Sequence, residues 1–79
     1  MSRTEETLDL TGIPCPANAA RALIAIESLP AGALLRISLD DGEPIRNVPP
    51  ALQEQGHAVI EQARAGAGWR VLVRRGEPA

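Results

Sequence analysis

Aromatic side chains are almost missing from this chain of 79 residues, which contains one Trp, no Tyr and no Phe. Its core must therefore be built from Leu, Ile, Val and Ala, and no stack of rings is available to bind bases or sugars. Lysine is also absent, so arginine supplies all eight basic residues, against ten acidic ones. A formal net charge of −2 without aromatic platforms argues against direct binding of nucleic acid.

Cysteine occurs once, at Cys15. One cysteine excludes an intramolecular disulfide and any metal site built only from cysteines of one chain. No long apolar run predicts a membrane span or a secretory signal. We therefore expect a cytoplasmic monomer that makes no membrane contact and holds no metal and no cofactor.

The hydrophobic pattern predicts six elements in the order strand, helix, strand, helix, strand, strand. Their expected ranges are 7–11, 17–29, 34–40, 47–55, 58–64 and 69–75. Four strands with one apolar face and two amphipathic helices predict an α/β fold. We expect a two-layer sandwich of βαβαββ order, in which a mixed four-stranded sheet carries both helices on one face.

The length allows one domain, residues 1–79. The polar segment 1–6 is predicted to be a disordered leader, and residues 76–79 a disordered tail. Residues 65–68 (Ala-Gly-Ala-Gly) are expected to join the last two strands as a hairpin.

In the first predicted helix, apolar residues recur at spacings of three and four and so form one stripe. Ala22 and Ile26 lie on this stripe, whereas Asn18 is expected to avoid it. Pro16 suits the first helical position, because its missing N–H would have no partner there in any case. Cys15 would then lie at or beside the N-cap.

In the second predicted helix, Pro49 and Pro50 are expected to fix the first turn, and Gly56 is a natural C-terminal stop. The acidic segment 40–43 before this helix is expected to be a solvated turn. It fails the ligand pattern of an EF-hand calcium loop.

Cys15 lies where a strand gives way to a helix, between Pro14 and Pro16 and shortly after Gly12. A thiol reacts as its thiolate, and the unpaired N–H groups and dipole of a helix N-terminus stabilise an anion. The same donors would stabilise a persulfide, which no second cysteine of this chain could resolve. A free cysteine is also commonly a small buried apolar residue, and the sequence leaves this alternative open.

The segment 8–16, Leu-Asp-Leu-Thr-Gly-Ile-Pro-Cys-Pro, resembles the start of the TusA/SirA family of sulfur-transfer proteins, whose hallmark is Cys-Pro-x-Pro. The similarity continues through residues 40–49 and covers roughly residues 8–75. Asn18 replaces the second proline of the hallmark, as in a Cys-Pro-x-Asn subgroup of similar proteins. An asparagine there can lie in the first helical turn and hydrogen-bond near the thiol.

The resemblance implies a βαβαββ sandwich and a sulfur-relay function. Cys15 would accept sulfane sulfur as a persulfide from a donor such as a cysteine desulfurase or a rhodanese and pass it to an acceptor protein. Gly12, Pro14, Pro16 and Asn18 would support the motif. Two alternatives remain open: a non-catalytic regulatory or interaction module, and a thiol redox sensor.

Four further residues have ordinary interpretations. His57, the only histidine, is expected at the surface or at a helix end rather than in a Cys–His pair. Trp69 is expected in the core. Arg70 and Arg74 share one face of the last strand and are expected to be solvated, with docking of an acidic partner as the alternative.

Overall fold

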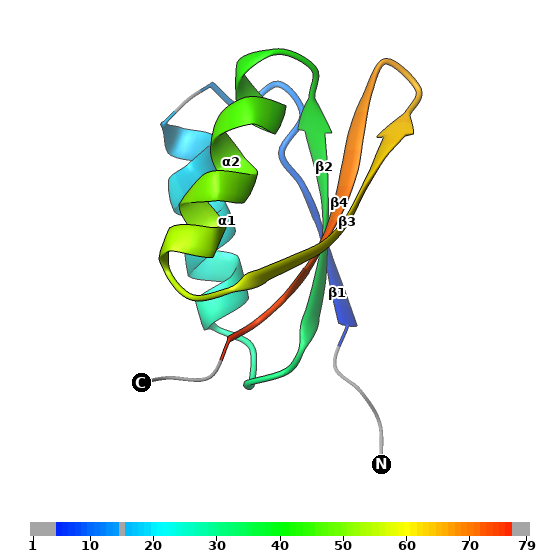
Figure 1. The fold of residues 1–79 in the computed structure, drawn as a ribbon. Coiled ribbons are helices and arrows are strands. Elements are labelled where there is room, and N and C mark those ends of the chain that lie inside the picture. The colour runs from blue at the N-terminus through cyan, green and yellow to red at the C-terminus, as the bar shows by residue number, and fades with distance from the viewer. Residues whose placement is uncertain (1–4, 15, 77–79) are drawn as a thin grey trace.

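The computed structural model describes residues 5–14 and 16–76, so Cys15 and the outermost residues of both predicted disordered ends lie outside the described residues. The elements are β1 (Glu5–Asp9), α1 (Ala17–Glu27), β2 (Leu34–Asp40), α2 (Glu43–Glu54), β3 (Ala58–Ala65) and β4 (Gly68–Arg74). The sheet order is β1-β2-β4-β3, with β1 parallel to β2 and the other pairs antiparallel. Both helices cover one face of this sheet (Figure 1). The predicted two-layer sandwich is confirmed.

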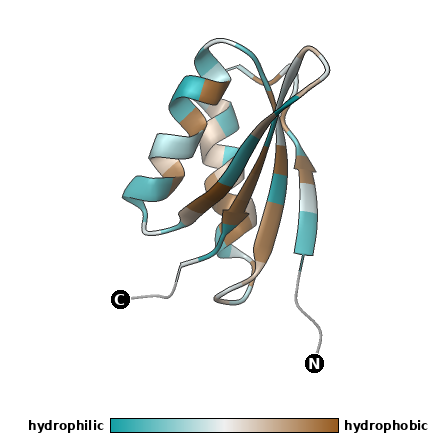
Figure 2. Cartoon of the chain, turned by 45° about the vertical axis from the view of Figure 1, so that its right-hand side comes forward, coloured by the Kyte–Doolittle hydropathy of each residue, from teal (hydrophilic) through white to brown (hydrophobic). Residues whose placement is uncertain are grey.

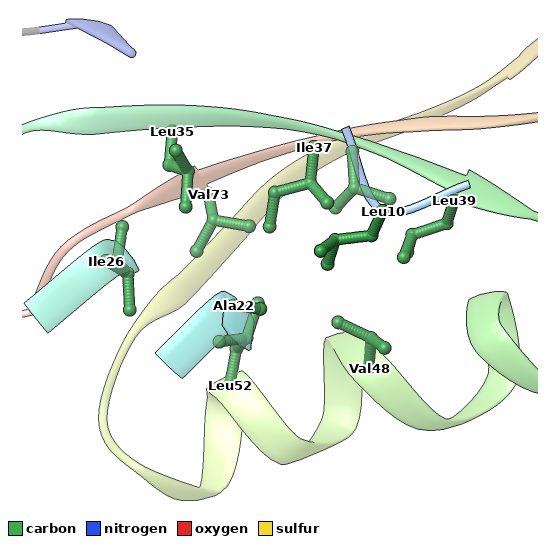
Figure 3. Packing of buried hydrophobic residues seen from close by; sticks show 10 residues of the cluster. Leu10, Ala22, Ile26, Leu35, Ile37, Leu39, Val48, Leu52 and Val73 are labelled. Carbon is green, nitrogen blue, oxygen red and sulfur yellow. The ribbon is translucent and has the colours of Figure 1, made fainter. Parts of the chain in front are cut away.

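The core lies between the helices and the two central strands, β2 and β4. Leu35, Ile37 and Leu39 alternate along β2 with half-buried residues and point at the helices, as the alternating pattern predicted. Val48 and Leu52 rise from α2 to meet them (Figure 3). Hydrophobic and hydrophilic residues are interspersed along both helices and along β2 (Figure 2), so these elements are amphipathic and each contributes one face to this aliphatic layer.

Four predicted boundaries were wrong by two or more residues: both ends of β1, the end of α1 and the start of α2. β1 begins at Glu5, so Glu5 and Glu6 pair with β2 instead of belonging to the leader. α2 begins at Glu43, and Pro44 occupies the first-turn position that we had given to Pro49 and Pro50. The later prolines lie inside the helix, where the buried face of α2 includes Pro49. Packing therefore outweighs the backbone hydrogen bonds that the two prolines cannot form.

Parallel pairing of β1 with β2 decides where the helices begin. The carboxyl ends of parallel strands lie at the same edge of a sheet, and each of these two strands leads into a helix. Both helices run back toward the opposite edge, so their N-termini lie at the same end of the molecule (Figure 1). In the described part of the chain, no helix combines the length and apolar character needed to cross a membrane.

The other face of the sheet is not covered by helices. Arg70 and Arg74 are exposed there on β4, in agreement with the predicted solvated face. At the edge of this face, Nε and Nη2 of Arg36 both donate to Oε2 of Glu5, at 3.1 and 2.7 Å. This exposed ion pair joins neighbouring strands β1 and β2, and we expect it to contribute little to stability.

His57 is buried, which corrects the expectation of a surface histidine, although it does follow the C-terminus of α2. The residue is 7% exposed. Nδ1 accepts a hydrogen bond from the Gly76 N–H at 3.0 Å, and Nε2 lies 3.4 Å from Oε2 of Glu27. An acceptor at Nδ1 leaves the ring proton on Nε2, facing the carboxylate. His57 therefore links the ends of α1 and α2 to the segment that follows β4.

We predict that His57→Ala lowers the free energy of unfolding by about 1 to 3 kcal/mol, because it removes a buried ring and leaves the half-buried Gly76 N–H without its acceptor. The control is His57→Asn, whose Oδ1 takes the place of Nδ1 and should recover part of the loss. Urea denaturation measures both variants. Equal stability of His57→Ala and the unmodified protein would show that the ring is not a structural link.

Candidate functional site

The segment between β1 and α1 is held against the end of β2 by backbone hydrogen bonds. Leu10 is 1% exposed, and its N–H donates to the Ser38 carbonyl at 2.9 Å, which continues the pairing one residue beyond β1. The Ile13 N–H then donates to the Leu10 carbonyl at 3.2 Å and closes a turn. The path of the chain is therefore fixed before it reaches the cysteine.

Asp40, the last residue of β2, holds this turn in place. Its Oδ2 accepts a hydrogen bond from the Gly12 N–H at 2.7 Å, between residues 28 positions apart in sequence. Gly12 has φ +80°, a conformation that costs a residue with a Cβ about 1–2 kcal/mol. Glycine at this position therefore lets the backbone turn and present its N–H to the carboxylate.

A second carboxylate stiffens the same turn from within. Oδ1 of Asp9 accepts from both the hydroxyl of Thr11, at 2.6 Å, and the Thr11 N–H, at 3.0 Å. These two donors, the hydroxyl first, lower the pKa of Asp9 below its usual value of 3.8. Asp9 is therefore ionised throughout the neutral range and keeps the turn closed.

The N-terminus of α1 has no acidic residue in its first turn. Its cap is Pro16, which we predicted at the first helical position, and α1 begins one residue later, at Ala17. A proline side chain cannot accept a hydrogen bond. The Asn18 N–H donates to the Pro14 carbonyl at 3.1 Å and the Ala20 N–H to the Pro16 carbonyl at 3.2 Å. The positive end of the α1 dipole is thus left without a compensating carboxylate of its own first turn.

Asn18 is fully buried, with 0% of its surface exposed, which corrects its predicted place off the apolar stripe. It precedes Ala22 and Ile26 at a spacing of four and shares their buried face. Its Oδ1 accepts from the Ala19 N–H at 2.7 Å. Within the described residues, its Nδ2 has no hydrogen-bond partner.

The acidic segment after β2 is more than the solvated turn that we predicted. A shallow hollow of about 430 Å³ separates it from the turn at residues 12–14, and its lining includes Asp40, Asp41 and Glu43. Asp41 Oδ1 accepts from the indole Nε1–H of Trp69 at 2.8 Å. This bond, followed by one from the Gly42 N–H, lowers the pKa of Asp41.

Trp69 therefore joins the β3–β4 hairpin to the turn before α2, and its half-buried ring is not the core residue that we predicted. The guanidinium of Arg64 lies 5.0 Å from the ring centroid, which adds a cation–π contact on the hairpin. The indole N–H needs a polar partner, and Asp41 supplies it at the exposed end of the ring.

The structure brings Gly12, Pro14, Pro16 and Asn18 together on either side of position 15, while Cys15 itself lies outside the described residues. His57 is not part of this group, because it lies at the far end of α2. In the ranges 5–14 and 16–76, no three His, Asp or Glu side chains are grouped as metal ligands would be.

Asp40 was missed as an anchor of the site. The signal that could have found it is positional: a carboxylate at the carboxyl end of one parallel strand faces the turn that leaves the neighbouring strand.

We predict that Asp40→Ala loosens the turn that precedes Cys15 and lowers the free energy of unfolding by about 1 kcal/mol, because the Gly12 N–H loses its acceptor. Under conditions in which the variant stays folded, the Gly12 amide should exchange its hydrogen faster than it does in the unmodified protein. Asp40→Asn is the matched control, since its carbonyl oxygen can still accept this bond. Unchanged exchange at Gly12 in Asp40→Ala would contradict the assignment.

A further prediction concerns the pKa of Asp9. Because this pKa is lower in the folded protein, the carboxylate stabilises the fold above its usual pKa of 3.8, and this effect is lost as pH falls through the folded value. Thr11→Val removes the hydroxyl donor and should raise the pKa of Asp9 toward 3.8. NMR titration of the carboxyl carbon measures it, with Asp41 as the internal reference. An unmoved Asp9 midpoint would rule out the hydroxyl as the main cause.

Comparison with known proteins agrees with this arrangement. A family model described as sulfurtransferase TusA matches residues 6–75. The chain is 28% identical over 71 residues to a candidate sulfur carrier protein of Archaeoglobus fulgidus, covering 89% of this chain and 81% of that protein. It is 31% identical over 68 residues to the candidate sulfur carrier protein YedF of Escherichia coli K12, covering 86% and 88%.

Solved structures show the same fold. The crystal structure of a SirA-like protein from Desulfitobacterium hafniense superposes with a TM-score of 0.77 at 24% identity, covering 91% of this chain and 99% of that one. A protein of Helicobacter pylori solved in solution gives 0.73 at 17% identity, covering 90% and 97%. With a family model that spans most of its length, the chain belongs to the TusA family of sulfurtransferases, and this membership supports a sulfur-relay role.

Proposed function

We propose that this protein is a cytoplasmic sulfur carrier whose Cys15 receives sulfane sulfur as a persulfide and passes it to an acceptor protein. The observation that carries the proposal is that the turn at residues 10–13 and the N-termini of α1 and α2 lie at the same edge of the sheet. Helix N-termini favour anions, and α1 has no carboxylate in its first turn to compete with a bound anion. A thiolate or a persulfide anion at position 15 would profit from both features.

The proposed transfer needs no external oxidant or reductant. The Cys15 thiolate attacks the outer sulfur of a persulfide on the donor, such as a cysteine desulfurase or a rhodanese. One S–S bond forms as the donor's S–S bond breaks, and the donor cysteine leaves as its thiolate. An acceptor thiolate then attacks the outer sulfur on Cys15 in the same way, so the electrons balance at each step.

The absence of a second cysteine fits a carrier better than an enzyme that releases its sulfur alone. A neighbouring thiol would attack the Cys15 persulfide and form an intramolecular disulfide, and this chain has no other thiol. The persulfide would therefore persist until an acceptor docks. Membership of the family implies both a donor and an acceptor protein.

The rigid turn around Gly12 adds a further argument. Two carboxylates, Asp9 and Asp40, fix the backbone that leads to position 15. A carrier must present its sulfur to two different active sites, and a fixed backbone lowers the entropic cost of doing so. We therefore propose Gly12, Pro14 and Pro16 as supports of Cys15.

The experiment that tests this function is intact mass spectrometry after incubation with a cysteine desulfurase and cysteine, without reductant. We predict a gain of one sulfur atom that reductant removes, and complete loss of this gain in Cys15→Ser. An incubation without cysteine is the control. If a folded protein with a free thiol takes up no sulfur from several donors, the carrier function is wrong, and the non-catalytic interaction module becomes the better hypothesis.

A further inference from the structure

The face of the sheet opposite the helices (Figure 1) contains a hollow of about 460 Å³. Its lining includes Leu34 of β2, Ile60 of β3 and Leu72 of β4. Ile60 is 49% exposed, and among the described residues the only other large apolar residue that is open to water is Ile24 on α1. An apolar hollow in a polar surface is typical of a place where another molecule binds.

Strand alternation and a β-bulge bring these side chains to one face. Leu34 and Leu72 each neighbour a core residue that points at the helices, so they themselves point away from the helices. The pairing of β3 with β4 shifts by one residue between Val59 and Glu61, and Ile60 is the extra residue there. Ile60 lies outside the core, so its apolar surface is available to a partner.

Two arginines on the same face carry charges that the fold leaves uncompensated. Arg70 and Arg74 lie two residues before and after Leu72 on β4, so all three side chains point to the same side. Neither arginine forms an ion pair within residues 5–14 and 16–76, whereas Arg36 and Arg64 each have a carboxylate partner. The middle of this face is therefore positive, although the chain as a whole has a formal net charge of −2.

The carboxylates of this face lie on its two edge strands. Glu5 on β1 is engaged by Arg36, and Asp9 on the same strand is engaged by Thr11. Glu61 lies on β3, the opposite edge strand, and β4 itself contains no acidic residue. The strip along β4 thus presents positive charge, and the negative charges border it.

We propose that this face binds an acidic segment of a partner protein, which inserts one aliphatic side chain into the hollow and places a carboxylate against each of Arg70 and Arg74. Burial of apolar surface supplies affinity, and the two charge pairs fix the orientation of the segment. The arginines are four residues apart, about 13 Å along a strand, and an extended segment with acidic residues two positions before and after its aliphatic residue has the same spacing. The proposal goes beyond the sulfur-carrier function and does not rest on it.

Other occupants fit this face less well. A hollow receives a single side chain, whereas a lipid surface offers no such group to fill it. A nucleic acid would meet a chain of negative net charge with a single aromatic residue. A second copy in a symmetric contact would bring the same positive strip to both sides, where like charges repel.

The test is an NMR titration of the isotope-labelled full chain, at low ionic strength, with the peptide acetyl-Ser-Glu-Ser-Leu-Ser-Glu-Ser-amide. We expect weak binding, with a Kd of about 1 mM, because the free peptide must be ordered when it binds. The amide shifts should be confined to the parts of β2, β3 and β4 around the hollow. A peptide with Ala in place of Leu should bind about tenfold more weakly, and so should one with Lys in place of both Glu.

Variants of exposed residues assign the binding to this face. Arg74→Glu should weaken binding of the first peptide about fivefold, because it replaces an attraction by a repulsion. Arg21→Glu, at an exposed position of α1, is the matched control: it makes the same change in net charge and should leave the Kd unchanged. Ile60→Ser removes one wall of the hollow, so the peptides with Leu and with Ala should bind this variant alike.

Equal weakening by Arg21→Glu and Arg74→Glu would overturn the proposal, as would the absence of amide shifts around the hollow at about 10 mM peptide. It would also be wrong if the chain dimerised through this face in sedimentation equilibrium, or if it bound phosphatidylglycerol vesicles through Arg70 and Arg74 but not the peptide. The titration needs no sulfur donor and no reaction at Cys15. Its failure therefore leaves the carrier function to the sulfur-loading experiment, and failed sulfur loading leaves this docking face standing.

Discussion

The parallel pairing of β1 with β2 is the constraint on which the rest of this structure depends. It brings Asp9 and Asp40 to the same edge of the sheet, and it makes both helices start there. The inward residues of β2, Leu35 and Ile37 among them, then pack under both helices. Without that pairing Gly12 would lose Asp40 as its acceptor, and the N-termini of the two helices would not lie at the same edge.

Carboxylates organise this edge by accepting hydrogen bonds from N–H and O–H groups more than by forming ion pairs. Asp40 binds the Gly12 N–H, Asp9 binds Thr11, and Asp41 binds the indole of Trp69. Gly12 and Thr11 lie in the loop after β1, where the sheet leaves N–H groups without partners, whereas Trp69 donates from its side chain on β4. These three carboxylates thus hold the turns in place, while the first turn of α1 contains no acidic residue that would repel an anion. At the opposite end, His57 closes the small core with its ring buried.

Most of the fold followed from periodicity. The range of β2 was predicted correctly, because strict alternation around Leu35, Ile37 and Leu39 fits only a strand with one buried face. The start of α2 was missed because Pro49 and Pro50 were interpreted as first-turn residues, although a long enough buried face can accommodate prolines inside a helix. Local propensity was overruled there by packing.

The sequence by itself determined the single cysteine at a strand-to-helix junction, the glycine and prolines around it, and the order of the six elements, because these depend on local spacing and chemistry. Only the tertiary structure decided that Asn18 is buried, that Asp40 holds Gly12 from 28 residues away, and that His57 lies inside the molecule. These features depend on which faces meet when the helices pack on the sheet. Such contacts join residues distant in sequence, and hydrophobic periodicity does not specify a hydrogen-bond partner across that distance.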